Sequence, residues 1–302
     1  MSDRLEALTR INLDDLVNAF GWQNHALLAW FLRRIFFRPA QIFAQQMLGF
    51  DAAIGKCGLA EAACSTEQLY VRDLCVFGLE RIPAGPCLFL SNHPGLTDTL
   101  ALFAALGRDD LKIIALDRPF LLSLPNVANQ LFFVKDEPQE RVALVRHVSE
   151  HLRAGGSVLT FPAGHNEPDP DVYGGAVRSL ESWVDSASVF LRLAPQTTVV
   201  AVCVRGVMWD KMARHPLVRL RHTHDDQQLL ASALQLLANV SLRSKPVIIR
   251  VQIGAPILPI GRDASGKRRG SGEAAVQHQA VLTEMKSLIE NAPIGAGRSL
   301  FS

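Results

Sequence analysis

The pattern of apolar and polar positions changes character about a quarter of the way along the 302-residue chain. Up to about residue 75, large apolar residues recur at helical spacing with few strand signals, which predicts an N-terminal helical segment. A short helix is expected to open at Asp14 and Asp15 and to end near Gly21. A dense apolar stretch follows over residues 26–49. Pro39 is expected to divide it into two helices, because proline removes a backbone donor and disfavours helix in the residue before it.

From about residue 76, short apolar runs rich in β-formers alternate with helical stretches. The expected strands are Cys87–Ser91, Lys112–Leu116, Leu131–Val134, Ser157–Phe161, Thr198–Val204 and Val247–Ile253. The expected helices are Asp98–Leu106, roughly Pro119–Asn129, Gln139–Arg153, Ala176–Leu193, Asp226–Val240 and Glu273–Glu290. Strands that are continuous apolar runs, separated by helices, indicate a mostly parallel sheet flanked by helices. The sequence therefore predicts an α/β domain over residues 76–302, preceded by a helical segment over residues 1–75.

Composition and charge narrow the class of protein without naming a function. Apolar residues make up 48% of the chain and charged residues 20%, which is typical of a globular protein. The net charge is +2 and no basic stripe is visible, so no nucleic-acid partner is expected. The five cysteines include no C-x-x-C pair and are expected to be reduced thiols. The stretch from Gly261 to Gly272, rich in glycine, serine and basic residues, is expected to be a flexible linker.

The N-terminal segment carries no expected signal peptide and no expected membrane span. Charged residues interrupt Met1–Arg10, and three arginines interrupt the apolar stretch that follows His25. Two interpretations of residues 26–48 remain open on the pattern alone. The segment is either a helical pair packed on the main domain, or an interfacial helix whose large apolar side chains enter lipid beneath arginines at head-group level. The side chains in question are Trp30, Phe36 and Phe37, with Arg33, Arg34 and Arg38.

The candidate chemistry lies after the first predicted strand of the α/β domain. In open α/β sheets, ligands bind beyond the carboxyl ends of the strands. His93 stands at such a strand end, Pro94 and Gly95 turn the chain, and Asp98 falls in the first turn of the next helix. A carboxylate in that position can hold one imidazole nitrogen and leave the other free to take a proton from a hydroxyl. Alternatively, His93 is a polar turn residue and Asp98 a partner of the helix dipole.

Three further segments follow this turn in a fixed order. Phe132–Lys135 ends a strand, Gly156–Val158 precedes Phe161-Pro162-Ala163-Gly164, and Val199–Val204 is an apolar strand. Over residues 78–206, this order and spacing resemble those of the phospholipid-biosynthetic acyltransferase family, whose type member is lysophosphatidic acid acyltransferase. That family carries N-H-x-x-x-x-D, then F-[VI]-x-R, then G-x-S-V-x-x-F-P-E-G-T-R-S.

The resemblance implies a glycerol-3-phosphate acyltransferase-like fold and an O-acyltransferase activity. The fatty acyl group would pass from acyl-CoA or acyl carrier protein, as co-substrate, to the hydroxyl of a lysophospholipid-type lipid, with His93 as general base and Asp98 holding it. No other cofactor and no metal are implied. The resemblance also implies a peripheral enzyme on the cytoplasmic face of a membrane, which favours the interfacial interpretation of residues 26–48.

The motif positions carry the expected substrate-binding residues and also the departures from the family. The expected residues are Lys135, Phe161, Pro162, Gly164, His165 and Asn166, with Arg118 and Arg178 as candidate substitutes for missing cations. Ala163, His165 and Asn166 stand where the family has glutamate, threonine and arginine, and Lys135 lacks the fork of the family's arginine. These departures put the binding of a phosphate in doubt. Two alternatives therefore remain, an acyltransferase for a non-phosphate acceptor such as a lyso-amino-acid lipid, and a catalytically silent lipid-binding relative.

Overall fold

A computed structural model describes residues 3–95, 97–135, 137–258, 272–295 and 297–301; residues 261–271 of the expected linker lie outside them. The strands are β1 (Asp73–Phe77), β2 (Cys87–Ser91), β3 (Leu111–Leu116), β4 (Leu131–Val134), β5 (Ser157–Thr160), β6 (Thr198–Arg205), β7 (Ile248–Ile253) and β8 (Arg298–Ser299). The helices are α1 (Asp3–Phe20), α2 (Ala26–Cys57), α3 (Leu59–Glu67), η1 (Leu79–Arg81), α4 (Asp98–Leu106), α5 (Pro119–Leu122), α6 (Pro125–Ala128), α7 (Pro138–Arg153), α8 (Ala176–Ser179), η2 (Leu180–Ser182), α9 (Ser186–Leu193), α10 (Asp210–Ala213), η3 (Pro216–Leu220), α11 (His224–Leu242) and α12 (Gly272–Glu290).

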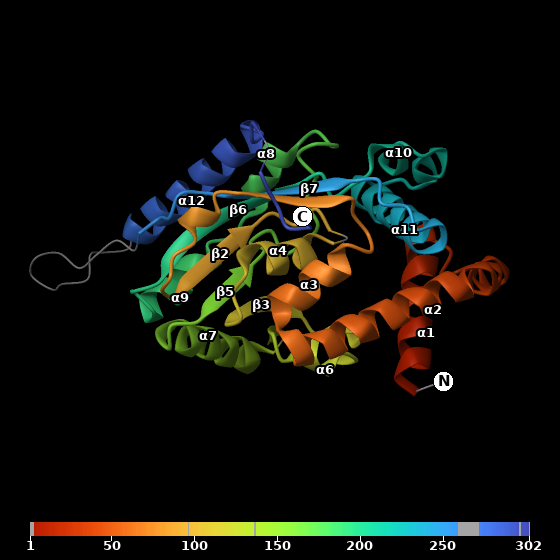
Figure 1. Ribbon diagram of the computed structural model, residues 1–302, viewed down its shortest axis with the longest axis horizontal. Coiled ribbons are helices and arrows are strands. Elements are labelled where there is room, and N and C mark those ends of the chain that lie inside the picture. Colours follow the sequence, from red (N-terminus) through yellow and green to blue (C-terminus); the bar gives the residue numbers. More distant parts are fainter. Residues whose placement is uncertain (1–2, 96, 136, 259–271, 296, 302) are drawn as a thin grey trace, which may run out of the picture.

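The strands form one sheet in the order β4-β3-β5-β2-β6-β7-β1-β8 (Figure 1). The five strands from β4 to β6 in this order all run in the same direction. β7 is antiparallel to β6, β1 is parallel to β7, and β8 is antiparallel to β1. The prediction of a mostly parallel sheet flanked by helices is therefore confirmed.

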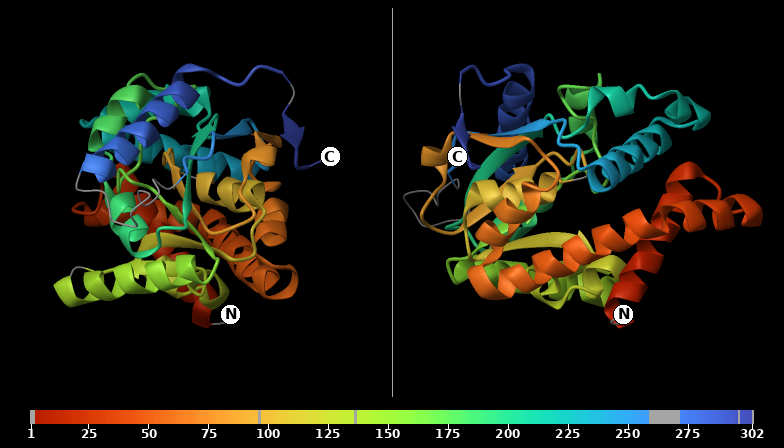
Figure 2. Two further views of the ribbon diagram at one scale, coloured as in Figure 1. Left: turned by 90° about the vertical axis from the view of Figure 1, so that its left-hand side faces the viewer. Right: turned by 45° about the vertical axis from the view of Figure 1, so that its right-hand side comes forward.

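Both faces of the sheet are buried because alternate strand residues enter two separate cores. In β2, Cys87 and Phe89 belong to the core that contains α3 and α4, whereas Leu88 and Leu90 belong to the core that contains α7, α9 and α12. Figures 1 and 2 show these two helical layers on opposite sides of the sheet. The continuous apolar runs in the sequence have this physical cause, since a strand covered on both faces has no polar side to expose.

The N-terminal segment forms a hairpin of two long helices, which corrects the prediction that Pro39 divides the second one. α2 runs unbroken through Pro39. Packing outweighs the lost hydrogen bond, because Ala29 and Leu32 of α2 form a small core with Val17 of α1. α1 also begins at Asp3, well before the expected start. The helical segment ends before β1, so residue 75 lies inside a strand.

Two predicted single helices are each divided in the structure. Pro125 starts α6 as a separate short helix after α5, because proline is well tolerated in the first turn of a helix. The expected helix over residues 176–193 is wrong in its middle, where Trp183 is extended between η2 and α9. Asp185 then caps α9 by accepting a hydrogen bond from the Ser188 N–H at 3.2 Å. The helix expected over residues 226–240 is present as α11, which starts two residues earlier at His224, and the Thr223 hydroxyl caps it by accepting the Asp226 N–H.

Candidate active site

The turn after β2 brings His93 and Asp98 into direct contact. Gly95 has φ +87°, a left-handed conformation that glycine adopts without strain, and this reverses the chain toward α4. His93 Nδ1 lies 2.7 Å from Asp98 Oδ2, and the same oxygen accepts the Gly95 N–H at 2.8 Å. The Thr99 hydroxyl donates to Asp98 Oδ1 at 3.1 Å. Asp98 is fully buried, so its carboxylate has a fixed position beneath the imidazole.

This contact defines which nitrogen of His93 is available for chemistry. The Asp98 carboxylate can only accept hydrogen bonds, so the proton between the two side chains resides on His93 Nδ1. Nε2 then carries a lone pair, and it has no hydrogen-bond partner among the described residues. The side chain is 27% exposed, which leaves that nitrogen open to a substrate.

Neighbouring strands hold this turn from two sides. The Asn92 side chain bridges to β6, donating to the Val204 carbonyl and accepting the Val204 N–H, both at 2.8 Å. β5 is the neighbour of β2 on the other side, and Phe161 directly after it stacks on the His93 ring at a centroid distance of 4.1 Å. The structure thus brings Phe161, one of the expected substrate-binding residues, against the His93–Asp98 pair.

Glu167 is part of this site although its role was not predicted from the sequence. It is buried, and its backbone N–H donates to the His93 carbonyl at 2.7 Å. Its Oε2 accepts the His93 N–H at 3.1 Å, while its Oε1 lies 2.8 Å from both Trp183 Nε1 and the Ser179 hydroxyl. Burial raises the pKa of Glu167, and the bonds from Trp183, Ser179 and His93 oppose that rise.

The pKa of His93 reflects three competing influences. Burial disfavours the charged imidazolium and lowers the pKa. The charge and hydrogen bond of Asp98, and then the charge of Glu167, act in the other direction, and the net result is a pKa raised above the ordinary histidine value. Asp98 therefore both orients the ring and stabilises the imidazolium that forms when Nε2 accepts a proton.

The other residues of the third motif lie on the loop after β5. Pro162 is buried and its carbonyl accepts the Val184 N–H at 3.2 Å. Gly164 has φ +70° and closes the turn, with its N–H donating to the Phe161 carbonyl. His165 is exposed, with Nδ1 at 2.8 Å from the Ala163 carbonyl oxygen. Asn166 is also exposed and packs against Gly95, where a Cβ would lie 3.2 Å from its amide nitrogen.

The candidate cations lie at other places along the carboxyl edge. Strands are spaced by about 4.8 Å, so β3 and β4 end roughly 10 Å and 14 Å away from β2. Arg118 follows β3 and Lys135 follows β4, and within the described ranges no hydrogen bond or ion pair joins either one to His93. Arg178 is exposed on α8.

Lys135 lies in a surface cleft that is acidic overall. The cleft has a volume of about 580 Å³ and is lined by Asp117, Lys135, Glu137, Gln139 and Glu140. The ammonium group of Lys135 lies 3.5 Å from Glu140 Oε2. Three carboxyl groups surround one amine here, which is unfavourable for an anionic ligand.

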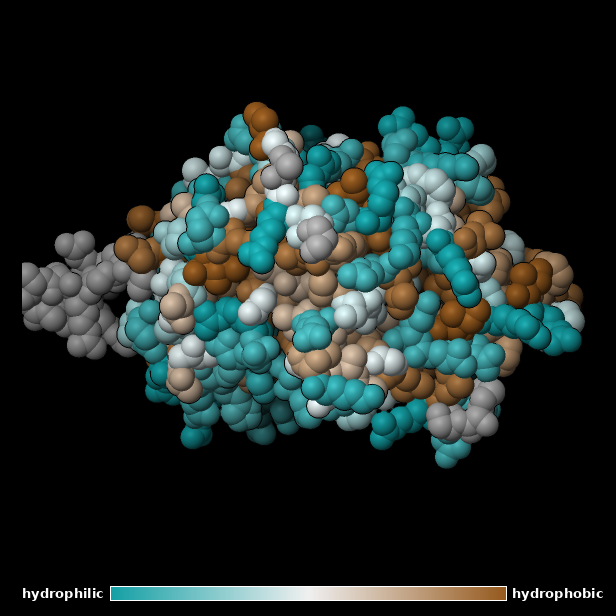
Figure 3. Space-filling model, in the orientation of Figure 1, coloured by the Kyte–Doolittle hydropathy of each residue, from teal (hydrophilic) through white to brown (hydrophobic). Residues whose placement is uncertain are grey.

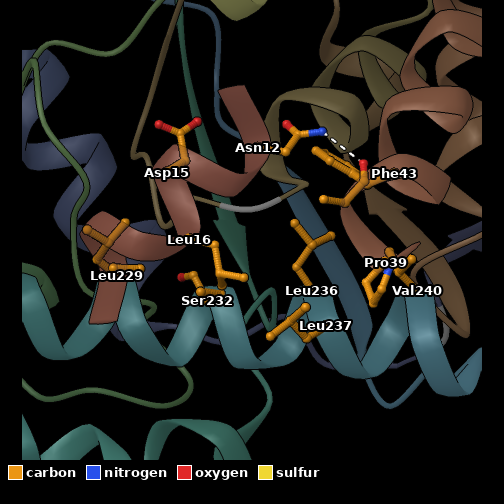
Figure 4. A pocket seen from close by; sticks show the side chains of 13 residues that line it. Asn12, Asp15, Leu16, Pro39, Phe43, Leu229, Ser232, Leu236, Leu237 and Val240 are labelled. Atoms are coloured by element: carbon orange, nitrogen blue, oxygen red, sulfur yellow. Dashed lines mark hydrogen bonds between the residues drawn. The ribbon is translucent and has the colours of Figure 1, made fainter. Parts of the chain in front are cut away.

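An apolar groove lies between the N-terminal hairpin and α11 (Figure 4). It encloses about 210 Å³, and its lining is mostly aliphatic and aromatic, with Asn12, Asp15 and Ser232 as the polar members. Burial raises the pKa of Asp15, whereas the nearby positive charge of Arg118 lowers it. Phe43, which lines the groove, stacks on Phe120 of α5 at a centroid distance of 6.0 Å, so this end of the groove lies near the segment that follows β3.

The described residues offer no group of three His, Cys, Asp or Glu side chains arranged to hold a metal ion. Within the same residues, no helix combines the length and apolarity needed to cross a membrane.

The site consists of a buried carboxylate that orients an accessible histidine at the carboxyl edge of a parallel sheet. An α/β protein with this arrangement is equipped for proton transfer. Residues 73–205, from β1 to β6, match the family model described as Acyltransferase.

One similar solved structure is the 1-acyl-sn-glycerophosphate (LPA) acyltransferase, PlsC, from Thermotoga maritima. The similarity covers 93% of this chain and 97% of that chain, with a TM-score of 0.40 and 15% sequence identity. No curated protein matches the sequence at a significant level.

Proposed function

We propose that the protein is an O-acyltransferase that moves a fatty acyl group from acyl-CoA or acyl carrier protein onto the hydroxyl of a lysophospholipid-type lipid. The observation that supports this most strongly is the 2.7 Å contact between His93 Nδ1 and the buried Asp98, which leaves Nε2 open as a base. The match of residues 73–205 to the acyltransferase family supports the reaction class.

The proposed chemistry needs no acylated enzyme residue. His93 Nε2 removes the proton from the acceptor hydroxyl as its oxygen attacks the thioester carbonyl. The new C–O bond forms, the tetrahedral intermediate collapses and the C–S bond breaks. The imidazolium then returns the proton to the departing thiolate, and Asp98 stabilises the imidazolium in between.

The acidic cleft at Lys135 favours a second candidate, transfer to an acceptor without phosphate, such as a lyso-amino-acid lipid. Lys135 is paired with Glu140, and Asp117 and Glu137 line the same cleft. An amine-bearing head group suits this charge pattern better than a phosphate does. Arg118 and Arg178 are the other cations proposed to contact the acceptor, and His165 and Asn166 lie on the loop nearest the His93 turn.

We further propose that the enzyme attaches to the cytoplasmic face of a membrane, and the exposed apolar side chains of α2 support the contact with lipid. Leu27, Trp30, Phe31 and Ile35 are exposed in its first three turns, with the arginines interspersed. Figure 3 shows apolar side chains gathered at the right-hand end of the molecule, where Figure 1 places the start of α2. Apolar rings beside cations are typical of helices that lie in a membrane interface.

The test is release of free thiol from acyl-CoA, with the lipid product identified by mass spectrometry. Lysophosphatidic acid and a lyso-amino-acid lipid are supplied separately and in competition. We expect acylation of one acceptor and a loss of roughly 10²–10⁴-fold in kcat for His93→Ala and Asp98→Asn, because the first removes the general base and the second removes the carboxylate that orients it. Product from the phosphate acceptor alone would reject the second candidate.

His147→Ala serves as the matched control, because His147 is an exposed histidine on α7. Its activity should equal that of the unaltered enzyme. Full activity in His93→Ala would refute the proposed function, and absence of thiol release with every acceptor would favour the silent lipid-binding relative.

A further inference from the structure

A residue outside the His93–Asp98 pair holds both backbone groups of the base. The Glu167 N–H donates to the His93 carbonyl at 2.7 Å, and the Glu167 carboxyl oxygen Oε2 accepts the His93 N–H at 3.1 Å. One residue thus fixes the peptide groups on both sides of the His93 Cα. The turn that carries the base cannot rotate without breaking one of these bonds.

The same side chain connects this turn to the helices on the far side of the loop. Glu167 Oε1 accepts the Trp183 indole N–H at 2.8 Å, and Trp183 is itself buried in the core with α7, α9 and α12. The Ser179 hydroxyl lies 2.8 Å from the same oxygen and also 2.8 Å from the Ala176 carbonyl. The carboxyl group therefore spans from the His93 turn to the segment formed by α8 and η2.

The charge of Glu167 is compatible with this position because its neighbours are donors. Backbone N–H, indole N–H and hydroxyl groups surround the two oxygens, and each of these bonds favours the ionised form. Two carboxyl groups thus act on His93, Asp98 from α4 and Glu167 from the loop after β5. Glu67 of α3 is a third carboxyl group, located close to Asp98.

We propose that Glu167 is a positioning residue, which fixes the backbone of His93 so that Nε2 points at the acceptor hydroxyl. The inference rests on the proposed role of His93 as general base. At the position where the phospholipid-biosynthetic acyltransferase family has glutamate, this chain has Ala163, whose side chain cannot fix the His93 backbone. Glu167, four residues later, has a side chain that reaches the turn.

Glu167→Gln is the principal test, because it retains the shape of the side chain and removes its charge. An amide has one acceptor oxygen, so its NH₂ group must face either the His93 N–H or the Trp183 N–H. We expect kcat to fall by roughly tenfold to a hundredfold with the KM of the acceptor nearly unchanged, since a displaced base lowers the rate without weakening binding. The low-pH limb of kcat should move to lower pH, because removal of a negative charge makes His93 less basic.

Two further variants separate positioning from folding. Trp183→Phe removes one hydrogen-bond donor to Glu167 and leaves the charge of Glu167, so the low-pH limb of its kcat profile should stay in place. Glu167→Asp keeps the charge, but its shorter side chain cannot span both sets of donors, so kcat should fall without a shift of the limb. Full kcat in folded Glu167→Asp would overturn the proposal, and this holds even if Glu167→Gln does not fold.

The control is Glu181→Gln, an exposed glutamate on η2, which should behave like the unaltered enzyme. A Glu167→Gln enzyme with reduced kcat but an unshifted limb would also overturn the proposal, because loss of packing alone would explain it. Activity retained in His93→Ala would instead refute the proposed function, so the two failures are distinguishable.

Discussion

At the residue scale, two opposing effects set the proton affinity of His93. Partial burial favours the neutral ring, and the carboxylates of Asp98 and Glu167 favour the charged one. The carboxylates prevail, so the imidazole is a stronger base than an isolated histidine. A stronger base gives a larger driving force for proton removal, but it is protonated, and therefore inactive, over a wider range of acidic pH.

This balance predicts the pH dependence of the reaction. The general base must be neutral at the start, so kcat/KM should fall as the pH drops through the pKa of His93 in the free enzyme. Since that pKa is raised, the half-maximal rate should occur above pH 6.5, the ordinary histidine value. Initial rates at substrate concentrations well below KM, in overlapping buffers, would measure it. A limb centred at or below 6.5 would contradict the expected electrostatics.

The residues of the site differ in how far the sequence can reveal them. His93 and Asp98 are five positions apart, so a turn followed by a helix suffices to predict their contact. Asn92 meets Val204 at a sequence separation of 112 positions, and Glu167 meets His93 at a separation of 74. Those contacts depend on which strands are neighbours, and a single sequence does not state that order. Glu167 had a sequence signal only as an acidic residue next to the third motif.

At the scale of elements, the exposed face of α2 predicts membrane binding. Phe31→Asp should lower the partition of the protein onto vesicles of phosphatidylcholine and phosphatidylglycerol by about tenfold or more, because burying one aromatic ring contributes roughly 1.5–3 kcal/mol. Cosedimentation with the vesicles measures this partition. Val142→Asp, on an exposed apolar position of α7, provides the control. Equal loss of binding in both variants would argue against α2 as the contact.

The groove between α1, α2 and α11 is suited to an aliphatic chain, and filling it should shorten the preferred acyl group. Ser232→Phe places a ring in the groove, whereas Ser241→Phe places it at an exposed position of the same helix. For Ser232→Phe, kcat/KM should decrease by roughly fourfold for each methylene excluded, or about 0.8 kcal/mol, with short-chain acyl-CoA little affected. A series of acyl-CoA chain lengths measures this. An unchanged chain-length profile would mean that the acyl chain lies elsewhere.

Strands of the sheet centre could be predicted well, and the helices around them less well. β2 and β6 are mostly apolar because both faces are covered, and this leaves a clear signal in the sequence. Buried and half-buried residues alternate along β1, and the strand begins at Asp73. Its apolar pattern in the sequence is therefore weaker, and this strand was not predicted. The course of α2 through Pro39 depends on packing against α1, and the local rule for proline does not include that energy.

At the scale of the whole molecule, the helical N-terminal segment places a buried carboxyl group close to Asp98 in the active site. Glu67, at the end of α3, is completely buried beneath α4, the helix that carries Asp98. Burial raises the pKa of Glu67 well above its ordinary value, the Thr97 hydroxyl opposes this, and the charge of Asp98 adds to it. The folded protein therefore favours the neutral form of this carboxyl group more than the unfolded chain does.

A neutral buried carboxyl group makes the stability of the fold depend on pH in a defined direction. Above pH 4.5 the unfolded chain releases the Glu67 proton while the folded chain keeps it, so rising pH favours unfolding until it passes the folded-state pKa. Glu67→Gln removes this titration. Its stability relative to the unaltered protein should improve by up to about 1.4 kcal/mol per pH unit within that window. Urea unfolding at pH 5, 6, 7 and 8 measures the difference, with Glu61→Gln, an exposed position of α3, as control.

If Glu67→Gln and the control gave parallel profiles, Glu67 would have to be ionised in the folded protein. A second negative charge would then stand beside Asp98, and the acidic limb of the enzyme would reflect three carboxylates rather than two.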